Sequence, residues 1–120
     1  MRVLLCDDAA EMRALLRWTL ERSGELDIVG EVADSTSALE LIARMELDVV
    51  LLDLQMPVLS PGELLRAIAQ IAPALPIVTF SGFEPEVVAP DAARLVTLHI
   101  PKTTDLQLVR EAVRDVAAQR

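Results

Sequence analysis

The stretch VVLLDLQMP, residues 49–57, joins four consecutive apolar residues to a carboxylate at Asp53. Uninterrupted apolar runs of this length are typical of strands that are buried on both faces, as in a parallel sheet. Three more apolar runs end at a polar group: LLCDD (4–8) at Asp7 and Asp8, PIVTFSG (76–82) at Ser81, and LHIPK (98–102) at Lys102. If these runs are parallel strands, their carboxyl ends gather the polar groups into one pocket.

Such a pocket suits a divalent cation and a phosphoryl group. Magnesium takes one or two carboxylates, keeps several waters and accepts phosphate oxygens. A lysine nearby balances the charge of an incoming phosphoryl group. The sequence therefore predicts a Mg²⁺ and phosphoryl site, provided that the fold brings these four segments together.

Short apolar runs alternate with amphipathic helical patterns along the whole chain. The runs expected to be strands are residues 3–6, 28–32, 49–52, 77–80 and 95–100. The helical patterns are 12–20, with Gly24 as its stop, 35–45, the segment that begins SPGELLRAI at Ser60, and 106–116. This order predicts an α/β fold with one five-stranded parallel sheet and helices on both faces. We also expect Trp18 and the methionines to fill the core.

One region departs from the alternation, because Pro85 and Pro90 fall where a fourth helix should run. A proline inside a helix costs about 3 kcal/mol or more. We therefore expect a short, broken or partly irregular fourth helix. By contrast, Ser60, Pro61 and Glu63 form the pattern of a capping box with proline in the first helical position, which is the best-marked helix start in the chain.

The composition restricts the class of protein. The 120 residues are expected to form one domain, 1–120. The formal net charge of −8 opposes direct contact with nucleic acid. Because Cys6 is the single cysteine, an intrachain disulfide and a cysteine-based metal site are excluded, which fits a reducing cytosol. Cys6 lies in an apolar run, and we expect it to be inert. No apolar stretch approaches membrane-spanning length. We expect a soluble, cytoplasmic protein.

Taken together, the paired aspartates, the aspartate in LLDLQMP, the hydroxyl in VTFSG and the lysine near the end resemble the receiver domain of two-component response regulators. The positions occur in the family's order over nearly the whole chain. The resemblance implies a doubly wound, flavodoxin-like (βα)5 fold with strand order 2-1-3-4-5. It also implies a phosphorylation-dependent switch that promotes its own phosphorylation and dephosphorylation without turning over external substrates.

By this resemblance, Asp53 is the phosphoacceptor, and its phosphoryl group comes from a sensor histidine kinase, a phosphotransfer protein or a small donor such as acetyl phosphate. Asp7, Asp8 and Asp53 hold Mg²⁺ together with the main-chain carbonyl of Gln55. Lys102 and the metal neutralise charge on the transferring oxygens. The resemblance further implies a downstream effector domain or protein as a partner, and a homodimer as one form of the switch.

Ser81 is similar to the family's switching hydroxyl, and His99 stands where the family usually has an aromatic ring that moves inward after phosphorylation. A histidine at that position could also titrate near neutral pH. The bulky side chains of Gln55 and Phe83 predict slow hydrolysis and therefore a long-lived phosphoryl group on Asp53. Thr103 replaces the proline that often follows the lysine in a cis bond, so we predict a trans Lys102–Thr103 bond.

Other interpretations remain open. Asp7 and Asp8 could cap the first helix, Asp53 and Ser81 could be turn formers, and Lys102 could be an exposed charge. The chain could also be a receiver-like scaffold that binds partners without phosphorylation. A magnesium-dependent phosphatase would use an aspartyl nucleophile as well, but Gln55 stands where a second aspartate serves as the acid. Because the chain ends just beyond the last expected helix, it either acts alone or precedes an effector domain that is absent from it.

Overall fold

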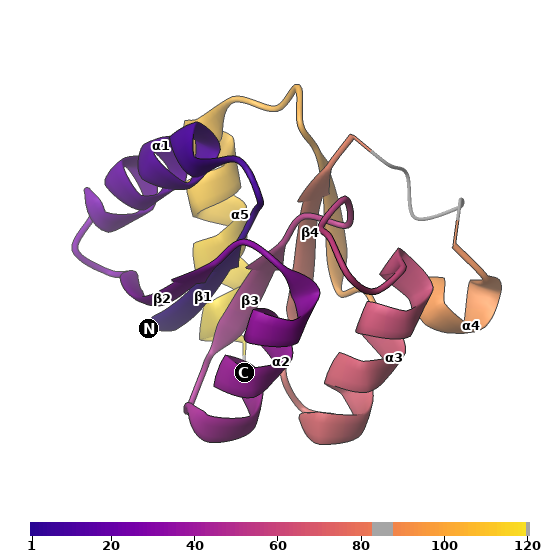
Figure 1. Ribbon diagram of the computed structural model, residues 1–120. Coiled ribbons are helices and arrows are strands. Elements are labelled where there is room, and N and C mark those ends of the chain that lie inside the picture. The colour runs from indigo at the N-terminus through magenta and orange to yellow at the C-terminus, as the bar shows by residue number, and fades with distance from the viewer. Residues whose placement is uncertain (83–87, 120) are drawn as a thin grey trace.

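Five parallel strands form a single sheet in the computed structural model, which describes residues 1–82 and 88–119. The strands are β1 (Arg2–Cys6), β2 (Asp27–Val32), β3 (Val49–Leu52), β4 (Ile77–Ser81) and β5 (Leu98–Pro101), and their order is β2-β1-β3-β4-β5. The helices are α1 (Ala10–Glu21), α2 (Ser35–Arg44), α3 (Pro61–Ile71), α4 (Pro90–Ala93) and α5 (Leu106–Ala118) (Figure 1). The predicted (βα)5 alternation and strand order are confirmed.

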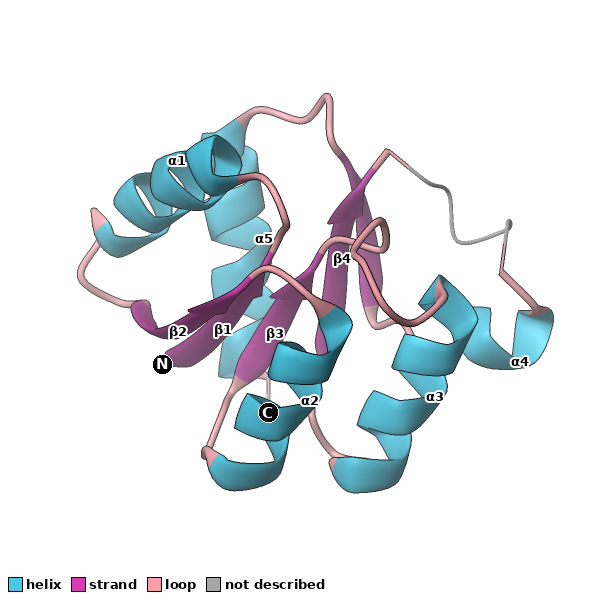
Figure 2. Ribbon diagram, in the orientation of Figure 1, coloured by secondary structure: helices cyan, strands magenta, loops and turns pink. Residues whose placement is uncertain are grey.

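The helices cover both faces of the sheet, with α1 and α5 on one side and α2, α3 and α4 on the other (Figure 2). Side chains therefore divide alternately between two apolar cores. In β1, Val3 and Leu5 belong to the core under α1 and α5, whereas Leu4 and Cys6 belong to the core under α2 and α3. This division explains the nearly uninterrupted apolar runs, since both faces of the strand are buried.

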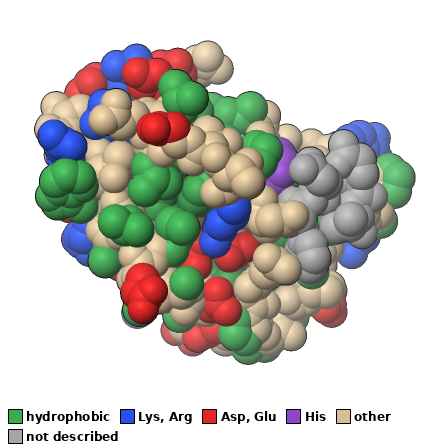
Figure 3. All heavy atoms as spheres, turned by 90° about the horizontal axis from the view of Figure 1, so that it is seen from above, with side chains coloured by type: hydrophobic (Ala, Val, Ile, Leu, Met, Phe, Trp, Pro, Cys, Tyr) green, Lys and Arg blue, Asp and Glu red, His purple; other side chains and the backbone are tan. Residues whose placement is uncertain are grey.

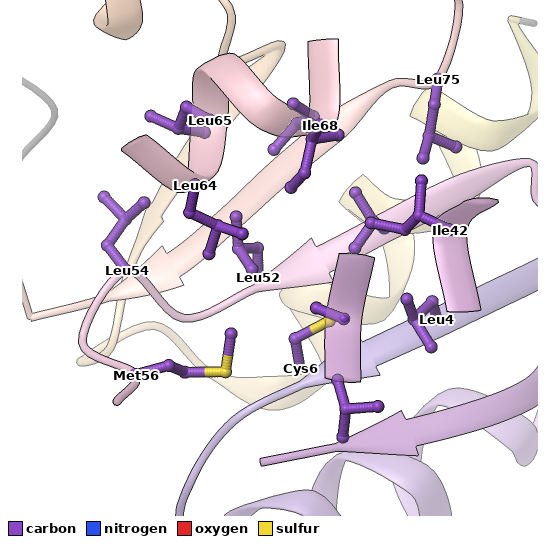
Figure 4. Packing of buried hydrophobic residues seen from close by; sticks show 14 of the residues in the cluster. Leu4, Cys6, Ile42, Leu52, Leu54, Met56, Leu64, Leu65, Ile68 and Leu75 are labelled. Atoms are coloured by element: carbon purple, nitrogen blue, oxygen red, sulfur yellow. The ribbon is translucent and has the colours of Figure 1, made fainter. Parts of the chain in front are cut away.

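Helix α3 packs over the centre of the sheet (Figure 4). Leu64, Leu65 and Ile68 are buried in the same cluster as Leu52 at the end of β3 and Leu54 in the loop that follows. The capping box predicted at the start of this helix is confirmed. The Ser60 hydroxyl accepts from the Glu63 amide, and the Glu63 carboxylate accepts from the Ser60 amide.

The core position predicted for Trp18 is wrong, because 63% of this residue is exposed. Leu16 and Leu20, one turn apart, form the buried face of α1. Trp18 lies on a neighbouring face, with its ring 4.4 Å from the guanidinium carbon of Arg22. Since more apolar residues are present than one helix face accommodates, periodicity alone does not choose among them. Of the methionines, Met56 is buried, Met12 and Met45 are partly buried, and Met1 is exposed.

The fourth helix is short, as predicted, with Pro90 in its first helical position rather than in its interior. Pro85 lies outside the described residues. The fifth strand begins at Leu98, three residues later than predicted, because residues 94–96 form the turn that leaves α4. The Lys102–Thr103 bond is trans, as predicted. Within the described residues, no helix has the length and apolar character needed to span a membrane.

Candidate functional site

Asp7 and Asp53 follow two strands that lie side by side. Cys6 is paired with Leu52 at the ends of β1 and β3, and the Asp53 amide donates to the Cys6 carbonyl at 2.9 Å. Asp7 and Asp53, the residues that follow Cys6 and Leu52, therefore both lie beyond the same edge of the sheet. Asp8 joins them, and one carboxylate oxygen from each of the three aspartates lies within 4.8 Å of the others. The structure thus brings together the three predicted carboxylates.

The three carboxylates differ in burial. Asp7 is 1% exposed and Asp53 is 4% exposed, whereas Asp8 is exposed to solvent. Figure 3 looks down on the carboxyl ends of the strands and shows acidic side chains gathered beside a basic one near the middle of this face. The site is therefore open on one side and closed below by the sheet.

Lys102 reaches this site from the loop after β5. Its Nζ lies 2.7 Å from Asp7 Oδ2 and 3.1 Å from Asp53 Oδ2. Partial burial opposes the charged form of Lys102, but the hydrogen bonds and charges of the two aspartates outweigh it and raise the pKa of the ammonium. The ammonium also lies 5.6 Å from the centre of the Phe80 ring. Lys102 is therefore a fixed cation at the site and not a freely exposed charge.

The other oxygens of the two buried carboxylates are fixed by nearby amides. Asp7 Oδ1 accepts from the Ala9 amide, and Asp53 Oδ1 accepts from the Gln55 amide, each at 2.9 Å. Three carboxylates against one ammonium leave an excess of negative charge, and their oxygens are the ligands that Mg²⁺ prefers. These residues fit a divalent cation.

Ser81 and His99, the two residues predicted to switch, lie on β4 and β5. Ser81 is buried at the end of β4, and its carbonyl accepts from the Lys102 amide at 3.3 Å. His99 is partly buried, and its Nδ1 lies 2.7 Å from Thr79 Oγ1 on the neighbouring strand. Gln55 is exposed beside the carboxylates. Phe83, predicted with Gln55 to slow hydrolysis, lies outside the described residues.

Cys6 lies directly before the acidic pair, but its thiol does not contribute reactivity. The side chain is 1% exposed, and burial, reinforced by the charge of Asp7, strongly raises the pKa of the thiol. Because the thiolate is the reactive form of cysteine, the thiol is inert at neutral pH. This agrees with the prediction from sequence.

Two residues that support the site were not predicted. Arg13 donates to the Asp7 carbonyl at 2.6 Å, and its guanidinium lies 3.6 Å from the Glu31 carboxylate on β2. Ser35 forms hydrogen bonds to the loop that follows Asp53. No short pattern marked Arg13, because its contact is with a main-chain carbonyl of the loop after β1. No local pattern marked Ser35, whose partner Pro57 is 22 residues away.

A family model described as the response regulator receiver domain matches residues 3–114. A protein-glutamate methylesterase/protein-glutamine glutaminase of Myxococcus xanthus is 40% identical over 89 residues, which are 72% of this chain and 26% of that protein. The chain thus spans about a quarter of the length of this relative.

Solved structures give the same fold. The REC domain of AraT, a response regulator from Geobacillus stearothermophilus, is 31% identical with a TM-score of 0.83, and the match covers 98% of this chain and 93% of that one. The signal receiver domain of NarL from Mycobacterium tuberculosis is 28% identical with a TM-score of 0.87, covering 99% and 97%.

Proposed function

This chain belongs to the response regulator receiver domain family, and we propose that it is a phosphorylation-dependent switch whose phosphoacceptor is Asp53. The observation that carries the proposal is the cluster of Asp7, Asp8, Asp53 and Lys102 at the carboxyl end of the sheet. A buried carboxylate held beside an ammonium and two further carboxylates is suited to phosphoryl transfer with a divalent cation.

In the proposed reaction, a carboxylate oxygen of Asp53 attacks the phosphorus of the donor. An acyl phosphate bond forms as the donor's bond to phosphorus breaks, and the electron pair stays with the leaving group: a histidine nitrogen of the kinase, which takes up a proton, or acetate from acetyl phosphate. Lys102 already donates a hydrogen bond to Asp53, so its ammonium is placed to neutralise charge on the oxygens of the phosphoryl group that is transferred. Mg²⁺ held by Asp7, Asp8, Asp53 and the Gln55 carbonyl would supply further positive charge there.

Ser81 is proposed to hydrogen-bond the new phosphoryl group, and His99 to move with it. The support is their position, since Ser81 ends the strand between the strands that lead to Asp53 and Lys102. A histidine kinase or phosphotransfer protein upstream, an effector domain or protein downstream and a cytoplasmic location complete the proposal. The relatives' greater length is consistent with a separate effector region.

The test is the intact mass of the protein after incubation with Mg²⁺ and acetyl phosphate. We expect a gain of one phosphoryl group, about 80 Da, in the native chain and none in Asp53→Asn. The matched control is Asp27→Asn, because Asp27 is an exposed aspartate at the start of β2, at the opposite end of the sheet. A gain that persists in Asp53→Asn would refute the assignment of the acceptor.

The short α4 is an observation that favours a second candidate, the receiver-like scaffold that binds partners without phosphorylation. A scaffold would bind its partner equally in the native chain and in Asp53→Asn. A switch would bind differently before and after treatment with acetyl phosphate. The complete acidic site makes the switch the better supported of the two.

A further inference from the structure

The loop between β3 and α3 contains an unusual backbone conformation. Val58 has φ of 93°, the one positive φ among the non-glycine residues that the structure describes. A β-branched residue with positive φ is a genuine outlier. Pro57 followed by a residue with positive φ is the pattern of a type II turn, where glycine or asparagine normally takes the second place. Val58 is 71% exposed, so no burial of its side chain offsets the strain.

Ser35, the first residue of α2, bonds to this turn on both sides of Val58. Its hydroxyl donates to the Pro57 carbonyl at 2.9 Å and accepts from the Leu59 amide at 2.8 Å. The Ser35 amide donates to the same Pro57 carbonyl at 3.2 Å. Ser35 is completely buried, so these bonds are shielded from competing water.

The turn is continuous with the phosphoryl site. Gln55 lies two residues before Pro57, and its amide donates to Asp53 Oδ1 at 2.9 Å. On the other side, Ser60 is fixed by the capping box of α3. Because Ser60 is fixed, a change in the turn would displace residues on its other side, toward Gln55.

We propose that Ser35 is a positioning residue: its hydroxyl holds residues 57–59 in the strained turn and thereby holds Gln55 where the metal and phosphoryl site requires it. The inference deepens the proposed function, and its consequence for metal binding rests on that function. The hydroxyl opposes the tendency of Val58 to leave positive φ. Without it, the loop would occupy the binding-competent conformation for a smaller fraction of the time, and the apparent affinity for Mg²⁺ would fall by that fraction.

The first measurement is hydrogen exchange of single backbone amides by NMR without metal, followed by titration with Mg²⁺. In Ser35→Ala we expect faster exchange at both Leu59 and Gln55, and a loss of about tenfold in Mg²⁺ affinity, as is found for residues that orient metal ligands. The matched control is Ser37→Ala in the same helical turn, whose hydroxyl bonds to Asp34 and not to the loop. The control should leave both amides and the affinity unchanged.

Rescue separates positioning from a general loss of stability. Asparagine tolerates positive φ, so Val58→Asn removes the strain that the hydroxyl opposes. We expect Val58→Asn to restore most of the Mg²⁺ affinity and the Gln55 protection to Ser35→Ala, while having little effect on affinity when Ser35 is present. Should Ser35→Ala fail to fold, Ser35→Cys keeps the size of the side chain with a much weaker hydrogen-bonding group and is tested in the same way.

Faster exchange confined to Leu59, with Gln55 unchanged, would overturn the proposal, because the turn would then not be coupled to the site. Equal loss of affinity with valine or asparagine at position 58 would also overturn it. Failure of the proposed function is separable, since it would appear as a native chain that binds no Mg²⁺, or binds it without becoming phosphorylated. The metal-free exchange results at Leu59 and Gln55 would still test the coupling in either case.

Discussion

Asp53 and its neighbours form a site whose electrostatics oppose stability. Asp53 and Asp7 are almost completely buried, Asp8 lies close to both, and Lys102 is the cation bonded to the two buried carboxylates. Buried like charges repel each other, and a buried charge loses hydration. Residues arranged for function in this way commonly lower the stability of the fold.

Replacement of Asp53 by asparagine is therefore expected to stabilise the metal-free protein by about 1 kcal/mol. The amide keeps an oxygen for the Gln55 amide and removes one negative charge, while Lys102 retains Asp7. Urea unfolding without Mg²⁺ measures the effect. Asp48→Asn is the control, because Asp48 accepts from the Arg2 amide away from the site and its replacement should not stabilise. An Asp53→Asn protein no more stable than the native one would contradict this electrostatic account.

For single residues, the sequence was sufficient to predict the place of those that directly follow a strand. Asp7, Asp53 and Lys102 were predicted to meet because the carboxyl ends of parallel strands share one edge. Ser35 and Arg13 could not be predicted in the same way. Each acts through main-chain groups of a loop, and the path of a loop is not encoded in a short pattern.

Among the elements, α3 joins the core to the loop beside the site. It buries Leu64, Leu65 and Ile68, and its N-cap residue, Ser60, follows directly after residues 57–59. The hydroxyl of Ser60 satisfies an amide that has no partner within the helix. The cap therefore fixes both the start of the helix and the end of the loop.

Ser60→Ala is expected to lower the free energy of unfolding by about 1 kcal/mol, the typical cost of losing a cap hydroxyl. Chemical denaturation measures it. Ser23→Ala is the comparison, because Ser23 is an exposed residue just beyond α1 that caps no helix start, and it should change stability by less than half as much, about 0.5 kcal/mol or less. Equal effects of the two substitutions would show that the capping box does not stabilise α3.

Elements with strong end signals were predicted closely, as α3 shows with its serine, proline and glutamate. The fifth strand began later than predicted because Leu95 and Val96 are apolar residues of a turn that packs against the core. The prediction that Trp18 lies in the core was wrong for a different reason, since this apolar residue lies on the exposed side of its helix. In both cases the residue type was clear, but the backbone conformation at residues 95–96 and the direction of the Trp18 side chain were not.

Across the whole molecule, the strand order decides where the chemistry lies. The chain passes from β1 to β2 on one side and then returns across β1 to β3, so the crevice beyond β1 and β3 is the switch point of the sheet. Asp7 and Asp53 flank that crevice, and Lys102 reaches it from β5. The alternation of strands and helices predicted the sheet, whereas the order of its strands came from resemblance to receiver domains.

The central claim is that this crevice directs a phosphoryl group to Asp53, and the position of the group tests it most directly. After incubation with Mg²⁺ and acetyl phosphate, borohydride reduces an acyl phosphate to a primary alcohol and leaves free carboxylates intact. Peptide mass spectrometry then locates the reduced residue. We predict reduction at Asp53 alone. Reduction at Asp7 or Asp8, or no reduced residue in a folded protein that binds Mg²⁺, would contradict the account.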